Sequence, residues 1–238
     1  MNGRTRWIAS LAIALTLLAV QVHAQPTGTT IEFNETDSPG VTPPDSRTDD
    51  GGTITTMVVD ALQQNPRWKA YVGNITGSLT LDDSNENTIF SWALDPSAIT
   101  GEVYASRNSS VSWVDIQCAA VGTITAEESF LGMSGTTVDS LSNTFNETTH
   151  PALSVGTSNI AVDTCSSTST FVDSARQSQG SADFPLILLE DPSENLVYVS
   201  PISPETTGYD GASLFDFQMI LANDPLSTTP YYFYVELG

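Results

Sequence analysis

The chain has 238 residues, with 28 acidic and only 7 basic side chains, and its formal net charge is −21 at pH 7. A surface of this charge repels nucleic acids and anionic lipids, because both are bound through basic patches. The composition therefore excludes nucleic acid as a partner and favours cations, neutral surfaces or basic proteins.

Residues 1–24 predict a secretory signal peptide. Two arginines precede an apolar run, and residues 22–24 supply a cleavage site before Gln25. A membrane anchor is the alternative, but the run of about 14 apolar residues is shorter than the roughly 20 that span a bilayer. A pilin-type leader would keep its apolar helix, which residues 25–28 end at once. We expect a secreted or cell-surface protein without an integral membrane segment after cleavage.

Residues 25–52 are rich in Thr, Pro, Gly and Asp, which predicts an extended linker. Within it, residues 29–33 carry Ile31 and Phe33 in alternation and predict a short strand. On a flexible leash, such a strand can fill an open sheet edge in its own domain or in a neighbouring copy. A disordered tail is the alternative.

From residue 53 to residue 238 the pattern predicts a single all-β domain, an antiparallel β-sandwich of jelly-roll or immunoglobulin-like type. Alternation in the later runs indicates strands with one buried side. The turn at residues 191–194 predicts a hairpin between the runs that flank it. The predicted strands span residues 53–60, 68–81, 88–94, 101–107, 111–119, 184–190, 195–201, 213–221 and 231–237.

The interval 119–164 predicts a short helical insertion that is tied to the domain by a disulfide. Cys118 and Cys165 are the only cysteines, and in an exported chain such a pair forms a disulfide. Thr125 and Glu128 fit a capping box, which predicts a helix from residue 126 to about residue 133. Two unpaired thiols are the alternative.

The stretch Arg67–Trp92 has the densest pattern in the chain and predicts a long hairpin. We expect residues 68–81 to pair with 88–94, with an irregularity near Gly73–Gly77. The turn between them offers side-chain oxygens at Asp83, Asn85 and Asn87. A solvated turn is the favoured interpretation, and a Ca²⁺ site is the alternative, since the glycine and glutamate of an EF-hand loop are missing.

Four Asn-x-Ser/Thr triplets mark Asn34, Asn74, Asn108 and Asn146 as N-glycosylation acceptors. The chain is so rich in Ser and Thr that about three such triplets are expected by chance. They predict glycans only if the organism has the transferase.

No catalytic motif stands out. His150 is the only histidine outside the leader and is predicted to be a solvated loop residue. No nucleophile elbow and no glycine-rich phosphate loop is present. Pairs of carboxylates are too numerous for any one to be singled out as a glycosidase site.

Three runs, "WKAYVGNITGSLTLDD", "FPLILLEDPSENLVYVSPI" and "PYYFYVELG", resemble parts of secreted microbial surface proteins with no assigned activity. The resemblance covers most of the chain after the leader and implies an exported β protein.

The first hypothesis for function is a non-catalytic extracellular structural protein, a subunit of a filament or coat. The second is a carbohydrate-binding or surface-polymer-binding module, for which exposed Trp68, Trp92 or Trp113 would supply stacking platforms, although burial is expected for each. The third is a hydrolase. No cofactor is predicted apart from the Ca²⁺ alternative.

Overall fold

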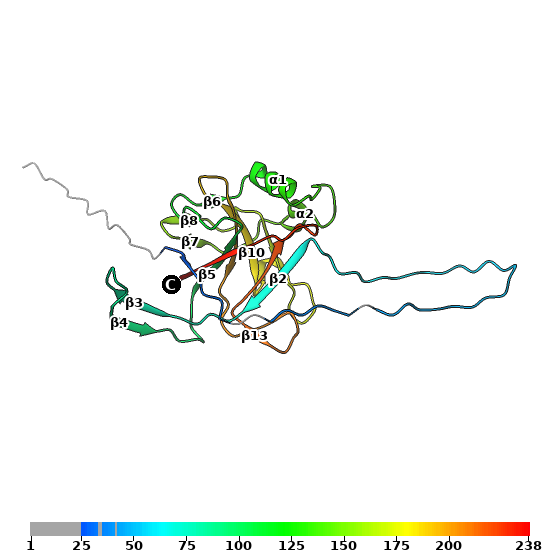
Figure 1. Ribbon diagram of the computed structural model, residues 1–238, viewed down its shortest axis with the longest axis horizontal. Helices are drawn as coiled ribbons and strands as arrows, with labels where there is room; N and C mark the ends of the chain where they lie inside the picture. Colours follow the sequence, from blue (N-terminus) through cyan, green and yellow to red (C-terminus); the bar gives the residue numbers. More distant parts are fainter. Residues whose placement is uncertain (1–24, 33–34, 41) are drawn as a thin grey trace, which may run out of the picture.

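The computed structural model describes residues 25–32, 35–40 and 42–238, and within them strands are mostly antiparallel and helices are few. The largest sheet has seven strands in the order β1-β15-β5-β11-β10-β6, with β9 also paired to β10 (Figure 1). Its strands are β1 (Thr27–Gly28), β5 (Gly101–Ser106), β6 (Gln117–Cys118), β9 (Ser167–Ser169), β10 (Pro185–Glu190), β11 (Leu196–Pro201) and β15 (Tyr232–Leu237).

Four two-stranded sheets and three short helices surround this sheet in the described part of the chain. The strand pairs are β2 (Trp68–Gly73) with β14 (Phe217–Ala222), β3 (Ser78–Asp82) with β4 (Thr88–Ala93), β7 (Leu153–Val155) with β8 (Ser158–Ile160), and β12 (Thr206–Thr207) with β13 (Leu214–Phe215). The helices are α1 (Val121–Phe130), α2 (Leu141–Thr144) and the 3₁₀ helix η1 (Gln179–Ser181).

Both faces of the large sheet are buried, which differs from the predicted single buried side. Leu186 and Leu188 of β10 face one hydrophobic cluster, while Ile187 and Leu189 face another. The first cluster includes side chains of β14, α1 and α2, and the second includes side chains of β7 and β8. Successive strand residues point to opposite faces, so β10 and β11 are mostly apolar because both faces are covered.

The disulfide between Cys118 and Cys165 is confirmed, with their Cα atoms 5.0 Å apart. Cys118 belongs to β6 and Cys165 lies just before β9, and both strands pair with the same edge of β10. The bond therefore joins two pieces of one composite edge strand. The segment between them supplies residues to both hydrophobic clusters, so it is part of the core.

The predicted helix is shifted. Helix α1 begins at Val121 rather than at residue 126, so Thr125 lies inside it and donates to the carbonyl of Val121 instead of capping. Glu128 is buried and accepts hydrogen bonds from the backbone and hydroxyl of Ser142. The capping-box prediction was wrong because Glu128 ties α1 to α2.

The hairpin 184–190/195–201 is confirmed as β10–β11. The long hairpin of residues 68–94 is only half correct. Residues 78–82 pair with 88–93, but β2 pairs with β14. The chain leaves the sheet at Asn74–Gly77, where the Asp216 carboxylate accepts from the backbone N–H of Ile75 at 2.7 Å. The irregularity at Asn74–Gly77 is therefore a connection between the pairs β2–β14 and β3–β4, and it is not a bulge within one hairpin.

Three other predicted strands differ. Residues 53–60 form no strand and are exposed, and of the run 111–119 only Gln117 and Cys118 are extended in a sheet. At the N-terminal end the strand is Thr27–Gly28 rather than 29–33, and Ile31 is 66% exposed. Phe33 of that prediction lies outside the described residues, as does the signal peptide of residues 1–24.

Candidate interaction site

The N-terminal segment closes one edge of the large sheet. Thr27 and Gly28 pair with Val235 and Tyr234 of β15, and both the backbone N–H and the hydroxyl of Thr29 donate to the carbonyl of Phe233, at 3.2 and 3.3 Å. Strand β1 therefore covers only part of the six-residue β15. A hollow of about 320 Å³ beside it is lined by Gly28, Thr29, Ile31, Ser109 and Tyr231–Tyr234.

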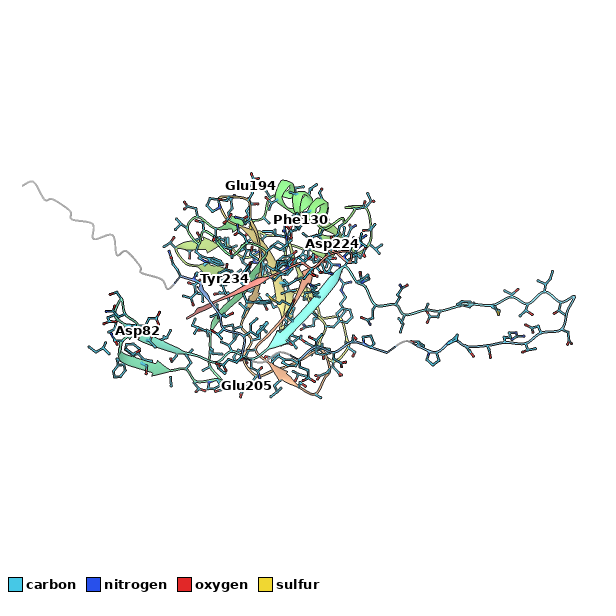
Figure 2. The ribbon with its side chains drawn as sticks, viewed as in Figure 1. Asp82, Phe130, Glu194, Glu205, Asp224 and Tyr234 are labelled. Carbon is cyan, nitrogen blue, oxygen red and sulfur yellow. A yellow bond between two sulfur atoms is a disulfide. The ribbon has the colours of Figure 1, made fainter. Side chains whose placement is uncertain are left out.

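An extended arm follows this strand. Residues 35–40 and 42–66 are exposed, contain no helix or strand, and run out from the body and back in Figure 1. Their side chains stand out into solvent in Figure 2. Hydrogen bonds at residues 37–53 join near neighbours, such as Arg47 with Asp49, while Asn65 at the base of the arm bonds to Asp139. The arm therefore makes β1 a tethered strand.

Hairpin β3–β4 projects from the other end of the molecule (Figure 1). Leu79 pairs with Trp92 and Leu81 with Phe90, so these four side chains share one face. Leu79 is 42% exposed, Trp92 51%, Leu81 55% and Phe90 56%. We call these four residues the hairpin face. The predicted burial of Trp92 was wrong, because its strand belongs to this isolated ribbon.

The other two candidate tryptophans lie in the core or at its rim. Trp113 is 9% exposed and packs between Tyr104 and Tyr234, with ring centroids 5.1 Å apart in both pairs. Trp68 is half-buried and donates from Nε1 to the carbonyl of Asp139. Trp92 is thus the exposed tryptophan of the three, and its neighbour Phe90 is tilted by 56° rather than coplanar.

The base of the hairpin holds a second hollow, of about 360 Å³. It is lined by Asn74–Gly77, Leu94, Pro96, Ile99, Glu205, Leu214 and Asp216. Asp216 is buried and accepts from the backbone N–H groups of Ile75 and Glu205, so its carboxylate holds the surrounding loops. Asn74 is exposed, and with its amide nitrogen turned to the body it reaches the carbonyl of Leu214 at 3.1 Å.

The candidate calcium loop is the turn of this hairpin. Asp83 accepts from the backbone N–H groups of Asn85 and Asn87 and from the side-chain amide of Asn87. These hydrogen bonds, led by the Asn87 amide, lower the pKa of Asp83. Its oxygens already serve the turn, and the described residues hold no group of three or more His, Cys, Asp or Glu placed for a metal.

The predicted exposure of His150 was wrong, because it is 3% exposed. Its Nε2 accepts from the backbone N–H groups of Thr164 and Cys165, and its Nδ1 lies 2.6 Å from the carbonyl of Pro151. Through these contacts the ring holds the loop beside the disulfide. The proximity of Cys165 in the fold, and nothing local in the sequence, explains this burial.

One carboxylate pair was not predicted from the sequence. Glu102 and Glu236 are cross-strand partners on β5 and β15, and the hydroxyl of Tyr104 lies 3.1 Å from Glu236 and 3.4 Å from Glu102. Burial, and then the charge of Glu236, raises the pKa of Glu102 to about 7. Glu236 also accepts from the backbone N–H of Gly156. The alternating pattern of each strand places Glu102 and Glu236 on a strand face, but it does not show that the two strands pair.

The remaining glycosylation acceptors differ in exposure. Asn146 is exposed, whereas Asn108 is half-buried and its side-chain oxygen accepts from the backbone N–H of Ser110. Asn34 lies outside the described residues.

Within the described residues no helix has the length and apolarity needed to cross a membrane. Comparison with known proteins gives no match to a family model, a curated protein or a solved structure.

Proposed function

We propose that this protein is a non-catalytic structural subunit of an extracellular assembly, joined to its neighbours by exchange of the N-terminal strand. The observation that carries the proposal is the tethered β1, which holds the β15 edge through two paired residues and Thr29. Residues 30–66 connect it to the body and can span on the order of 120 Å. The same strand can thus reach the same edge in a second copy, as in domain swapping.

An extracellular place fits the chemistry of the chain. A disulfide is stable in an oxidising compartment, and the net charge of −21 keeps an exported protein soluble. The signal peptide of residues 1–24 and glycans at the Asn-x-Ser/Thr triplets belong to the same proposal. So does a sandwich of jelly-roll or immunoglobulin-like type, in which β2–β14 forms a second, incomplete layer over the large sheet.

The described acids support a structural role rather than catalysis. The buried carboxylates of Glu128, Glu190, Asp191 and Asp216 all accept hydrogen bonds from backbone N–H groups. A carboxylate engaged in this way caps loops and strand ends.

Substitution of Thr29 by Pro tests strand exchange in the full-length chain. Proline removes the N–H that bonds to Phe233 and also the hydroxyl, so exchange should fail while the core stays intact. We expect wild-type protein to form oligomers or filaments in sedimentation and negative-stain imaging, and Thr29→Pro and a 25–36 deletion to stay folded but to form smaller assemblies, because both lack the β1 contact. Thr36→Pro, in the arm, is the control. Unchanged assembly in Thr29→Pro and the deletion would refute the mechanism.

Binding of a carbohydrate or another surface polymer is the second candidate, and exposed Trp92 favours it, because sugar faces stack on aromatic rings. The 56° tilt between Phe90 and Trp92 means that the two rings do not form one flat platform. Retention of the protein on immobilised polysaccharides, compared with Trp92→Ala, tests this candidate.

A further inference from the structure

The hairpin face is an apolar surface that the described chain leaves uncovered. Its four residues are all more than 40% exposed, whereas the opposite face of the ribbon carries Ser78, Thr80, Ser91 and Ala93. Ile89, which is 79% exposed, lies at the register shift of the ribbon. A contiguous exposed apolar patch, rather than single exposed apolar residues, marks an interaction site in soluble proteins. A two-stranded ribbon is also marginally stable alone in water, so a third strand would stabilise it.

A second uncovered apolar surface lies in the arm, in residues 53–62, here called the arm segment. Five of its side chains are 61–100% exposed: Ile54, Met57, Val58, Val59 and Leu62. The segment contains no helix or strand, and residues 54–64 make no hydrogen bond with any other described residue. Ile54, Thr56 and Val58 would share one face of a strand, and all three are β-branched residues that favour strands.

The two surfaces lie at opposite ends of one copy (Figure 1). The arm enters the body at the start of β2 and the hairpin follows from its end, and they occupy the two ends of the long axis in Figure 1. An element at one end that fits a surface at the other end makes a head-to-tail contact, which continues from copy to copy instead of closing.

The distribution of charge also favours contact between the arm segment and strand β4. In a chain of net charge −21, Asp60 is the only charged residue between residues 53 and 64, and Thr88–Ala93 contains none. The outer edge of β4 is therefore an uncharged place for a strand from an equally acidic neighbour. Main-chain hydrogen bonds to β4 would add to the apolar contacts that the hairpin face makes.

We infer that the arm segment of one copy adds as a third strand to the outer edge of β4 in a second copy, with Ile54 and Val58 packed against the hairpin face. The contact deepens the proposed assembly and uses neither β1 nor the edge of β15. It gives each subunit a second connection to its neighbour, made by a different strand.

The test mixes variants of the full-length chain, each also carrying Thr29→Pro to remove strand exchange. Val58→Pro removes an N–H and disables the arm, while Trp92→Glu places a charge on the hairpin face. Both positions are exposed, so each variant should fold. The matched controls are Thr48→Pro elsewhere in the arm and Ser91→Glu on the opposite face of the hairpin.

Tagged Val58→Pro should retain untagged Trp92→Glu about tenfold better than it retains untagged Val58→Pro, since only the first pair has one working arm and one working hairpin. Two Trp92→Glu copies should likewise fail to associate, and the control variants should associate as the parent does. Sedimentation of the mixed pair should show dimers rather than longer chains.

Three outcomes would overturn the inference. Equal retention in all pairs would mean that the arm and hairpin do not meet. Association of Val58→Pro with itself that Trp92→Glu abolishes would mean that two hairpins pair with each other. Loss of retention on immobilised polysaccharide in Trp92→Glu, without any asymmetry between pairs, would make the hairpin face a sugar site. If only the proposed exchange of β1 were wrong, the mixed pair would still be retained better than Val58→Pro with itself.

Discussion

Burial separates residues that the sequence presents as equivalent. Trp92 and Trp113 both stand in strand-like runs, but Trp92 is 51% exposed and Trp113 is 9% exposed between two tyrosines. Trp113→Ala should lower the free energy of unfolding by about 3–5 kcal/mol, while Trp92→Ala should lower it by less than about 1 kcal/mol. Urea denaturation of the two variants measures the difference, and equal losses would contradict the described exposure.

Glu102 should make the stability of the protein depend on pH. Its pKa of about 7 lies above its usual 4.5, because it is partly buried and lies beside Glu236. The folded state therefore binds this proton more tightly than the unfolded state does. The resulting stability is fully present below about pH 4.5 and is lost as the pH rises through 7.

Glu102→Gln removes that titration. Above pH 7 the variant should be more stable than the wild type by about 1–3 kcal/mol, and the wild-type loss between pH 4.5 and 7 should shrink. Chemical denaturation at pH 4.5, 6 and 8 gives the comparison, with Glu205→Gln on the surface as the control. A variant with the wild-type pH profile would show that Glu102 ionises freely.

At the scale of elements, the disulfide holds together an edge made of two short strands. Strands β6 and β9 have two and three residues, and both pair with β10. Opening a loop with a sequence separation of 47 residues should cost about 2–4 kcal/mol of stability. The Cys118→Ser/Cys165→Ser variant should show this loss and faster hydrogen exchange in both strands. If reduction of the wild type leaves its unfolding midpoint unchanged, the expectation fails.

The local sequence pattern was sufficient to predict a hairpin whose two strands are joined by a short turn. Asp191 caps the turn between β10 and β11 by accepting from Ser193 and Asn195, and that hairpin was predicted with nearly correct ends. The same held for the turn at Asp83. The pairing of the cysteines followed from their number and the expected compartment.

The local sequence pattern gave wrong predictions where the pairing of a strand depends on residues far away in the sequence. Residues 68–73 alternate like the start of a long hairpin, but β14, more than 140 residues later, supplies their partner. Residues 53–60 have strand composition yet no partner within the described chain, since propensity alone does not form a sheet. The candidate site depends on these two outcomes, because the uncovered arm and hairpin lie on either side of β2.

At the scale of the whole molecule, charge opposes association. Copies with a net charge of −21 repel each other, and Arg47, Arg67 and Arg107 already pair with acids of their own chain. Contacts between copies would therefore be apolar and main-chain rather than ionic. Salt shortens the reach of the repulsion from about 30 Å at 0.01 M to about 3 Å at 1 M.

Association should accordingly strengthen as sodium chloride rises from 0.01 M to 1 M, because screening weakens the repulsion while apolar and main-chain contacts persist. Sedimentation velocity across this range measures the fraction of oligomer at fixed protein concentration. Thr29→Pro combined with Val58→Pro, which lacks both proposed connections, should stay monomeric at every salt concentration and serves as the control. Assembly that dissolves as salt is added would place ion pairs at the centre of the interface, and neither β1 nor the arm segment could then be its main component.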